Sequence, residues 1–158
     1  MIWRSDCVKN CIKKANKKHT KQMYDILYSF FPIHNIFKNK NKSKKFLNEN
    51  IKEFLVSIND GKVEGTLRIV KRNEENGHCL INFKHIASKN KNKEILKDLI
   101  KYAEKNSAPG KIELHIAESE KPNKTFFTKL GYEVEGKLKN HYRPKETCYI
   151  LGKTVKKH

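Results

Sequence analysis

The sequence predicts an α/β fold, in which a mixed, mostly antiparallel central sheet is flanked by about four helices. Two observations predict it. Stretches of alternating apolar and polar residues, typical of half-buried strands, are separated by the turn dipeptides Asp60-Gly61 and Asn76-Gly77. The spacing then changes to that of an amphipathic helix between residues 95 and 103, and short strands follow it.

The N-terminal third predicts one strand and two helices. Residues 8–15 read as a short strand. Thr20 is the expected N-cap of a helix that ends at Pro32. The lysine-rich run 38–45 is expected to be an exposed, self-repelling loop, with a short helix at 44–50. The apolar stripe of the first helix consists of Met23, Ile26, Leu27, Phe30 and Phe31.

Three strands at 51–59, 62–71 and 78–87 are expected to form an antiparallel meander, because hairpin dipeptides connect them. Each strand has one apolar face. These faces are Phe54, Val56 and Ile58 in the first, Val63, Gly65, Leu67 and Ile69 in the second, and Cys79, Ile81, Phe83 and Ala87 in the third.

The C-terminal half predicts a helix at 95–103 and a strand at 111–117, joined to the meander as a parallel, right-handed crossover. A helix at 121–130, with Gly131 as its left-handed stop, precedes two closing strands at 132–140 and 146–155. The expected element order is β-α-α-β-β-β-α-β-α-β-β.

The length of 158 residues fits one domain, so we expect a single domain over residues 1–158. No apolar run approaches the roughly 18 residues of a membrane span. The N-terminal residues MIWRSDCVKN lack the apolar stretch of a signal peptide. We therefore expect a cytoplasmic protein without a membrane partner.

The chain carries 35 basic and 17 acidic side chains, a net charge of +18. Such an excess attracts acidic partners, nucleic acid among them. A compositional bias towards Lys, Asn and Ile explains the same excess equally well, and both explanations stay open.

The cysteines Cys7, Cys11, Cys79 and Cys148 form no paired CxxC motif. Cys7, Cys11 and His19 fit structural zinc spacing poorly. We expect reduced thiols and no metal site.

The segment Phe126-Phe127-Thr128-Lys129-Leu130-Gly131-Tyr132-Glu133-Val134-Glu135-Gly136, together with the element order, resembles the GNAT superfamily of N-acetyltransferases. Members often read F-Y-x-K-L-G-F-x-x-x-G there. The tail from Glu135 to Lys153 also resembles many members, and the resemblance covers about residues 8–155.

The resemblance implies an acetyl-CoA site at the start of the helix after the fourth strand, where free main-chain amides hold the pyrophosphate. The family's glycines there correspond to Glu94 and Leu96, and residues 88–96 contain no glycine. A solvated basic loop is the alternative for residues 89–93. The cofactor-binding residues implied are Ile86, Ala87, Ser88, Lys91, Asn92, Lys93, Glu94, Ile95, Leu96, Asn123, Phe127 and Lys129.

Two catalytic residues are expected, His85 and Tyr142. His85 stands where members often have a carboxylate, and its ordinary pKa near ~6.5 suits a general base. Tyr142 is the candidate acid or acceptor-orienting group, because the usual family tyrosine falls on Phe127, which has no proton to donate. A partly buried structural histidine and an exposed hairpin tyrosine are the alternatives.

The function implied is transfer of acetyl from acetyl-CoA to a primary amine. The acceptor stays open among a protein N-terminus or lysine, a small amine and an aminoacyl-tRNA. The alternative is a catalytically reduced domain of the same fold that binds nucleic acid or another acidic partner. The glycine-free loop and the KNKNK segments at 38–42 and 89–93 favour this alternative.

Overall fold

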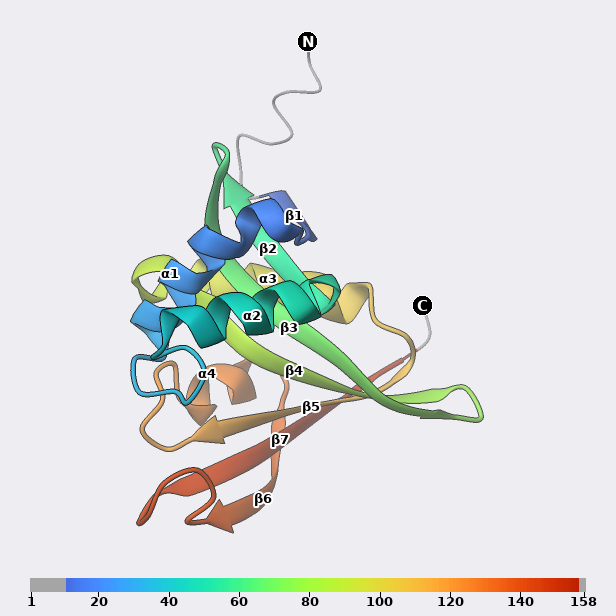
Figure 1. The fold of residues 1–158 in the computed structure, drawn as a ribbon. Helices are drawn as coiled ribbons and strands as arrows, with labels where there is room; N and C mark the ends of the chain where they lie inside the picture. Colours follow the sequence, from blue (N-terminus) through green and yellow to red (C-terminus); the bar gives the residue numbers. More distant parts are fainter. Residues whose placement is uncertain (1–10, 157–158) are drawn as a thin grey trace. The chain divides into compact units, whose positions relative to one another are not determined.

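A computed structural model describes residues 11–156, and their elements follow the expected order (Figure 1). The strands are β1 (Cys11–Lys14), β2 (Phe54–Asn59), β3 (Lys62–Glu75), β4 (His78–Ser88), β5 (Gly110–Ala117), β6 (Glu133–Lys139) and β7 (Thr147–Val155). The helices are α1 (Thr20–Phe30), α2 (Lys40–Asn50), α3 (Lys93–Lys105) and α4 (Lys124–Lys129), with short 3-10 turns η2 (Lys17–His19), η3 (Ile51–Glu53) and η4 (Lys89–Lys91).

The strands form one mixed sheet in the order β1-β2-β3-β4-β5-β7-β6. The pairing of β4 with β5 is parallel, which confirms the direction of the predicted crossover. Contacts divide the chain into two compact units. The first contains residues up to Ile69 and His85–Ala103, and the second contains Val70–Lys84 and the residues from Glu104 onward. A single domain over residues 1–158 therefore stays a prediction.

In the first unit, α1 and α2 cover one face of the strands and α3 covers the other. Met23 and Leu27 of α1 pack with Phe54 and Val56 of β2 in one buried cluster. On the opposite face, Gly65 leaves room for α3, because a Cβ there would lie 2.6 Å from the Ile95 side chain.

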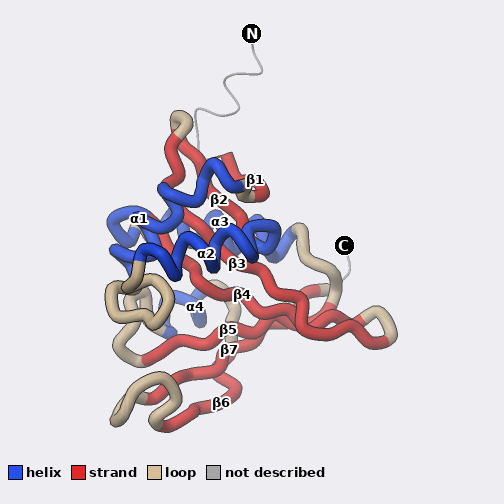
Figure 2. The backbone as a smooth tube through the Cα atoms, in the orientation of Figure 1, coloured by secondary structure: helices blue, strands red, loops and turns tan. Residues whose placement is uncertain are grey.

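The lysine-rich run is helical, so the loop expected at 38–45 is wrong from Lys40 onward. Asn39 caps α2, since its Oδ1 accepts the amide of Lys42 at 2.9 Å. Ser43 and Leu47 are buried, while the lysines of this helix point outward and stay solvated. Figure 2 shows α2 as helix across this run.

Other boundaries also differ from the expectation, and β3 extends to Glu75 instead of ending at residue 71. Thr20 is the first residue of α1 and not its N-cap, and its hydroxyl donates to Asn48 Oδ1 at 3.0 Å. The strand expected from residue 51 begins at Phe54, after a 3-10 turn. The helix expected at 121–130 covers only Lys124–Lys129. Residues 8–10 of the first expected strand lie outside the described residues.

A β-bulge corrects the expected face of β3. Ser57 pairs with Gly65 and Ile58 pairs with Val63, so Glu64 is the extra residue on the bulged strand. Val63 therefore packs in the cluster under α1, whereas Gly65 faces α3. The expected single apolar face containing both residues is wrong, because one inserted residue reverses the alternation.

In the second unit, β7 pairs with β5 on one side and with β6 on the other, both antiparallel (Figure 1). Gly110 begins β5 beside Cys79 of β4. Its φ is +150°, and a Cβ there would lie 2.0 Å from the Cys79 carbonyl oxygen. Only glycine fits this close approach of two backbones.

A partly buried ion pair joins distant segments of the second unit. Lys153 Nζ donates to both carboxylate oxygens of Glu104, at 3.0 and 3.1 Å, and to the Leu130 carbonyl at 2.8 Å. The hydroxyl of Tyr132, which is 2 % exposed, donates to Glu104 at 2.7 Å. Gly131 ends the preceding segment with φ +97°, as expected.

Among the residues that the structure describes, no helix has both the length and the apolar character needed to span a membrane.

Candidate active site

The segment between β4 and α3 adopts a glycine-like backbone without glycine. Asn90 and Lys91 both have left-handed φ values, 55° and 51°. Asn enters this region more easily than most residues, and Lys pays a larger steric cost. The tight turn that glycines give in the resembling family is therefore formed here by other residues.

Asn92 caps α3 and collects its first free amides. Its Oδ1 accepts the amides of Glu94 at 3.0 Å and Ile95 at 3.3 Å. Its own carbonyl accepts the Leu96 amide at 3.3 Å and the Ser88 hydroxyl at 2.9 Å. Some of the amides expected to hold a pyrophosphate thus already donate hydrogen bonds. Two of them, those of Glu94 and Ile95, donate to the side chain of Asn92, which is neutral and exposed.

An anion can take the place of this side chain. A phosphate oxygen makes stronger, charge-assisted hydrogen bonds to amides than a neutral carboxamide does. The helix has 13 residues, so its dipole also favours an anion at this end. Lys89, Lys91 and Lys93 are exposed around the turn, and Glu94 is the only acidic residue in the first helical turn.

The other predicted residues of this segment have buried side chains. Ile86, Ala87 and Ser88 end β4 in the interior, and Ile95 and Leu96 face the core of the first unit. A ligand can therefore meet Ile95 and Leu96 only through their main chain. Lys91 Nζ also lies 6.0 Å from the Phe30 ring centroid.

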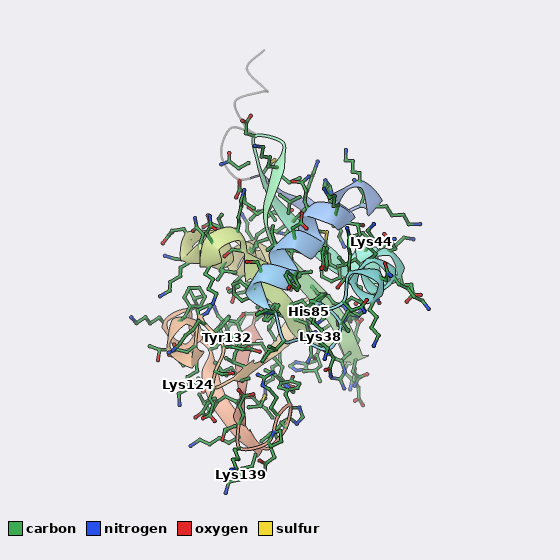
Figure 3. The ribbon with its side chains drawn as sticks, turned by 60° about the vertical axis from the view of Figure 1, so that its left-hand side comes forward. Lys38, Lys44, His85, Lys124, Tyr132 and Lys139 are labelled. Carbon is green, nitrogen blue, oxygen red and sulfur yellow. The ribbon has the colours of Figure 1, made fainter. Side chains whose placement is uncertain are left out.

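His85 (labelled in Figure 3) lies in an aromatic cluster. Its ring centroid is 5.0 Å from that of Phe37 and 5.5 Å from those of Phe46 and His34. Its φ of 52° is left-handed, a strained conformation that the surrounding packing must hold. His85 is half-buried, and its ring neighbours Phe37 and Phe54 belong to the apolar cluster that also contains Ala87.

Tyr142 lies in the loop between β6 and β7 and is 56 % exposed. Desolvation, followed by the neighbouring Cys148 and Glu120, raises the pKa of its phenol to about 12. The phenol therefore stays protonated at neutral pH and has a proton to donate. Its predicted role, acid or acceptor-orienting group, stays a prediction.

Glu120, which the sequence analysis missed, lies close to Tyr142. Burial raises the pKa of its carboxyl from 4.5 to about 7, although Arg143 opposes the shift. A carboxylate with a pKa near neutrality is suited to take a proton. The signal in the sequence was a carboxylate shortly after the carboxyl end of β5, where functional side chains often gather.

Burial also determines the protonation state of the Cys148 thiol, which lies near Glu120 and Tyr142. Cys148 is 1 % exposed, and desolvation followed by Glu120 and Glu146 raises its pKa to about 11. The thiol is therefore protonated at neutral pH in the absence of a ligand.

The residues predicted from the helix at 124–129 have mixed placements. Asn123 is the N-cap of α4, and its Oδ1 accepts the Thr125 amide at 3.1 Å. Phe127 is 2 % exposed and packs edge-on to Tyr132, with ring centroids 6.3 Å apart. Lys129 is exposed at the end of the helix. Cofactor contacts of all three residues stay predictions.

Comparison with known proteins identifies the family. The family model described as "Acetyltransferase (GNAT) domain" matches residues 13–149. No curated protein matches the chain in a sequence comparison.

Solved structures share the fold at low identity. An aminoglycoside 6'-acetyltransferase type Ii superimposes with TM-score 0.76 and 16% identity, over 94% of this chain and 99% of that chain. The aminoglycoside 6'-N-acetyltransferase from Enterococcus faecium gives 0.75 and 15%, over 94% and 98%. An aminoglycoside 6'-N-acetyltransferase complexed with coenzyme A gives 0.75 and 17%, over 94% and 98%.

The family match covers most of the chain, and the sheet order and parallel crossover agree with it. Acetyl-CoA is the acetyl donor that this family uses. The chain belongs to the GNAT family of acetyltransferases.

Proposed function

We propose that the protein transfers an acetyl group from acetyl-CoA to a primary amine. The observation that carries this proposal is the α3 N-terminus in a GNAT chain, where two main-chain amides converge on the displaceable oxygen of Asn92. The donor supplies an activated thioester, so positioning alone gives much of the rate.

The residues of the first unit fit the diphosphate of the donor. The amides of Glu94 and Ile95 would bind a phosphate oxygen in place of Asn92 Oδ1. Lys89, Lys91 and Lys93 would add positive charge from exposed, flexible side chains. The left-handed turn at residues 90–91 leads the chain into α3 and contains no glycine.

We assign proton abstraction from the amine to Glu120. Its carboxyl has a pKa of about 7, so a large fraction is ionised at neutral pH and the basicity is sufficient to take a proton. His85 is the weaker candidate, because aromatic rings surround its imidazole on several sides. Tyr142, whose phenol keeps its proton, would donate a hydrogen bond to the leaving thiolate.

The charge of the chain favours an acceptor amine on a neutral or acidic carrier. The structural neighbours include enzymes named for aminoglycosides, which carry several ammonium groups. A chain with net charge +18 repels such polycations and attracts polyanions. The lysines of α2, including Lys44 (labelled in Figure 3), would contribute to this attraction.

A binding role without catalysis is the second candidate. The exposed lysines of α2 favour it, because a helix holds Lys40, Lys42, Lys44 and Lys45 in defined directions. Binding of an acidic polymer through them should weaken steeply with salt. If this candidate function is right, Glu120→Gln still binds the acidic polymer, and acetyl-CoA binds to the protein no better than a control nucleotide does.

Thermal unfolding with acetyl-CoA and with desulfo-CoA tests the donor site. Both ligands should stabilise the protein saturably, by about 2.7 kcal/mol at a hundredfold excess over Kd. Release of free coenzyme A thiol in the presence of a primary amine then reports transfer. Glu120→Gln should lower this rate and leave the thermal shift unchanged. Absence of stabilisation by either ligand would refute the proposal.

A further inference from the structure

A cluster of three potential metal ligands lies in the second unit, beside the groups assigned to proton transfer. It consists of His115, His141 and Cys148, whose ligand atoms all lie within 4.8 Å of one another. Within residues 11–156 it is the only group of three such side chains at this separation. We propose that these three residues bind one Zn²⁺ ion.

Strand register brings two of the ligands together. His115 of β5 pairs with Ile150 of β7, and Ala117 pairs with Cys148. His115 and Cys148 are therefore diagonal neighbours on one face of the antiparallel pair, within reach of a side chain as long as histidine. The pairing is continuous from Gly110 to Ala117, so these two positions are held by a regular ladder.

The third ligand comes from the loop that joins β6 to β7. His141 lies just after the end of β6, and its ring centroid lies 6.1 Å from that of His115. Hydrogen bonds hold the loop at its base. The Asn140 amide donates to the Glu146 carbonyl at 3.0 Å, and the Lys145 amide donates to Asn140 Oδ1 at 2.7 Å.

The Glu113 carboxylate orients the His115 ring for metal binding. Its Nε2 lies 3.0 Å from Glu113 Oε1, which is on the same face of β5 two residues away. A proton on Nε2 leaves the Nδ1 lone pair free to coordinate. Carboxylate–histidine pairs of this kind orient the ring and raise its basicity in zinc sites.

The donor set selects the ion. One thiolate and two neutral imidazoles suit Zn²⁺, which takes four ligands in a tetrahedron. Bonds of about 2.3 Å to sulfur and about 2.0 Å to nitrogen require ligand atoms about 3.5 Å apart. His141 is exposed, so side-chain rotation can close the remaining gap.

Three protein ligands leave the fourth position to water. On binding, the Cys148 thiol releases its proton to solvent as the Zn–S bond forms.

Cobalt provides a direct test on the whole chain, after chelator treatment and in a thiol-free reductant. Co²⁺ should give a thiolate-to-cobalt charge-transfer band and the intense visible bands of a tetrahedral site. Zn²⁺ should abolish both at one ion per chain. Absence of the charge-transfer band, or a stoichiometry other than one, would overturn the proposal.

Variants locate the ion. His141→Ala changes an exposed loop side chain and should weaken Zn²⁺ binding at least 100-fold with the fold intact. His78→Ala, at an exposed position of β4, is the matched control and should bind as the parent does. Glu113→Gln should weaken binding about 10-fold through His115. Parent-like affinity in His141→Ala would refute the site.

Further cysteine variants identify the sulfur ligand. Cys148→Ser should lose the charge-transfer band, and Cys11→Ser should keep it. Loss of the band in Cys11→Ser alone would place the ion elsewhere and refute the proposal. Should Cys148→Ser fail to fold, the affinity of His141→Ala for Zn²⁺ still supports or refutes the site.

Discussion

Asn92→Asp exchanges the neutral cap of α3 for a charged one of the same shape. The new carboxylate keeps the hydrogen bonds that Asn92 Oδ1 accepts from Glu94 and Ile95, at 3.0 and 3.3 Å. Because it is negative and lies at a helix N-terminus, it should raise the free energy of unfolding by about 0.3–1 kcal/mol. The same charge lies where we expect the diphosphate of acetyl-CoA to bind.

The loss of affinity follows from the distances. A phosphate oxygen would approach the same amides at about 2.9 Å, so the carboxylate would lie about 5 Å from the phosphate charge. At an effective dielectric of about 20, unit charges at that separation repel by about 3 kcal/mol. Residue 92 is exposed, and screening reduces this to about 1.4–2.8 kcal/mol, or about 10- to 100-fold in Kd.

Calorimetric titration with acetyl-CoA and urea unfolding of the free protein measure the two effects separately. Asn39→Asp is the matched control, because Asn39 Oδ1 caps α2 by accepting the Lys42 amide at 2.9 Å. It should gain similar stability and keep the parent affinity. Parent-like affinity in Asn92→Asp, with the expected gain in stability, would show that the diphosphate binds elsewhere.

Three further predictions concern the second unit. Ionising Glu120 costs stability as the pH rises from 4.5 towards about 7, because burial raises its pKa. Urea unfolding should therefore find Glu120→Gln about 3 kcal/mol more stable than the parent at pH 8 and equal to it at pH 4, since one pKa unit corresponds to about 1.4 kcal/mol. Gly110→Ala places a methyl group 2.0 Å from a main-chain oxygen and should cost more than about 3 kcal/mol in the same assay. Gly136→Ala, which meets a side chain at 3.4 Å, should cost less than about 1 kcal/mol. Tyr132→Phe removes the 2.7 Å hydrogen bond to Glu104. It should lower the free energy of unfolding by about 2 kcal/mol and with it the midpoint of thermal unfolding. An unchanged midpoint would contradict this prediction.

Element order was predictable because periodicity and turn chemistry agreed along most of the chain. Asp60-Gly61 and Asn76-Gly77 adopt the positive φ values that tight hairpins need. The apolar positions of α3, from Ile95 to Ala103, are all buried as the helical spacing predicted. Local signals of this kind depend little on what packs around them.

The two KNKNK segments show where such reasoning stops. A solvated loop was the expectation for the first segment and the alternative for the second, yet Asn39 caps α2 and Asn92 caps α3. Propensity alone does not separate a capping asparagine from one in a loop, since both conformations are extended before the helix begins. The buried positions Ser43 and Leu47, and not the lysines, determine that α2 forms.

Site residues were harder to predict, because they depend on contacts between distant segments. Glu120 acquires its raised pKa from burial that residue spacing does not reveal. His115 and Cys148 are 33 positions apart and meet only through the register of β5 and β7. Within the first unit, Lys91, Asn92 and Lys93 were assigned together because they are consecutive in the chain, and their contact with the cofactor stays a prediction.

The ammonium group of Lys153 has a consequence for synthesis of the chain. Its partner Glu104 is made 49 residues earlier, and the Leu130 carbonyl it also binds is made 23 residues earlier. Until the ribosome has released nearly all of β7, that carboxylate has no such cation to neutralise it. We therefore expect the second unit to reach its native form only after β7 has left the ribosome, because β5 lacks its antiparallel partner until then.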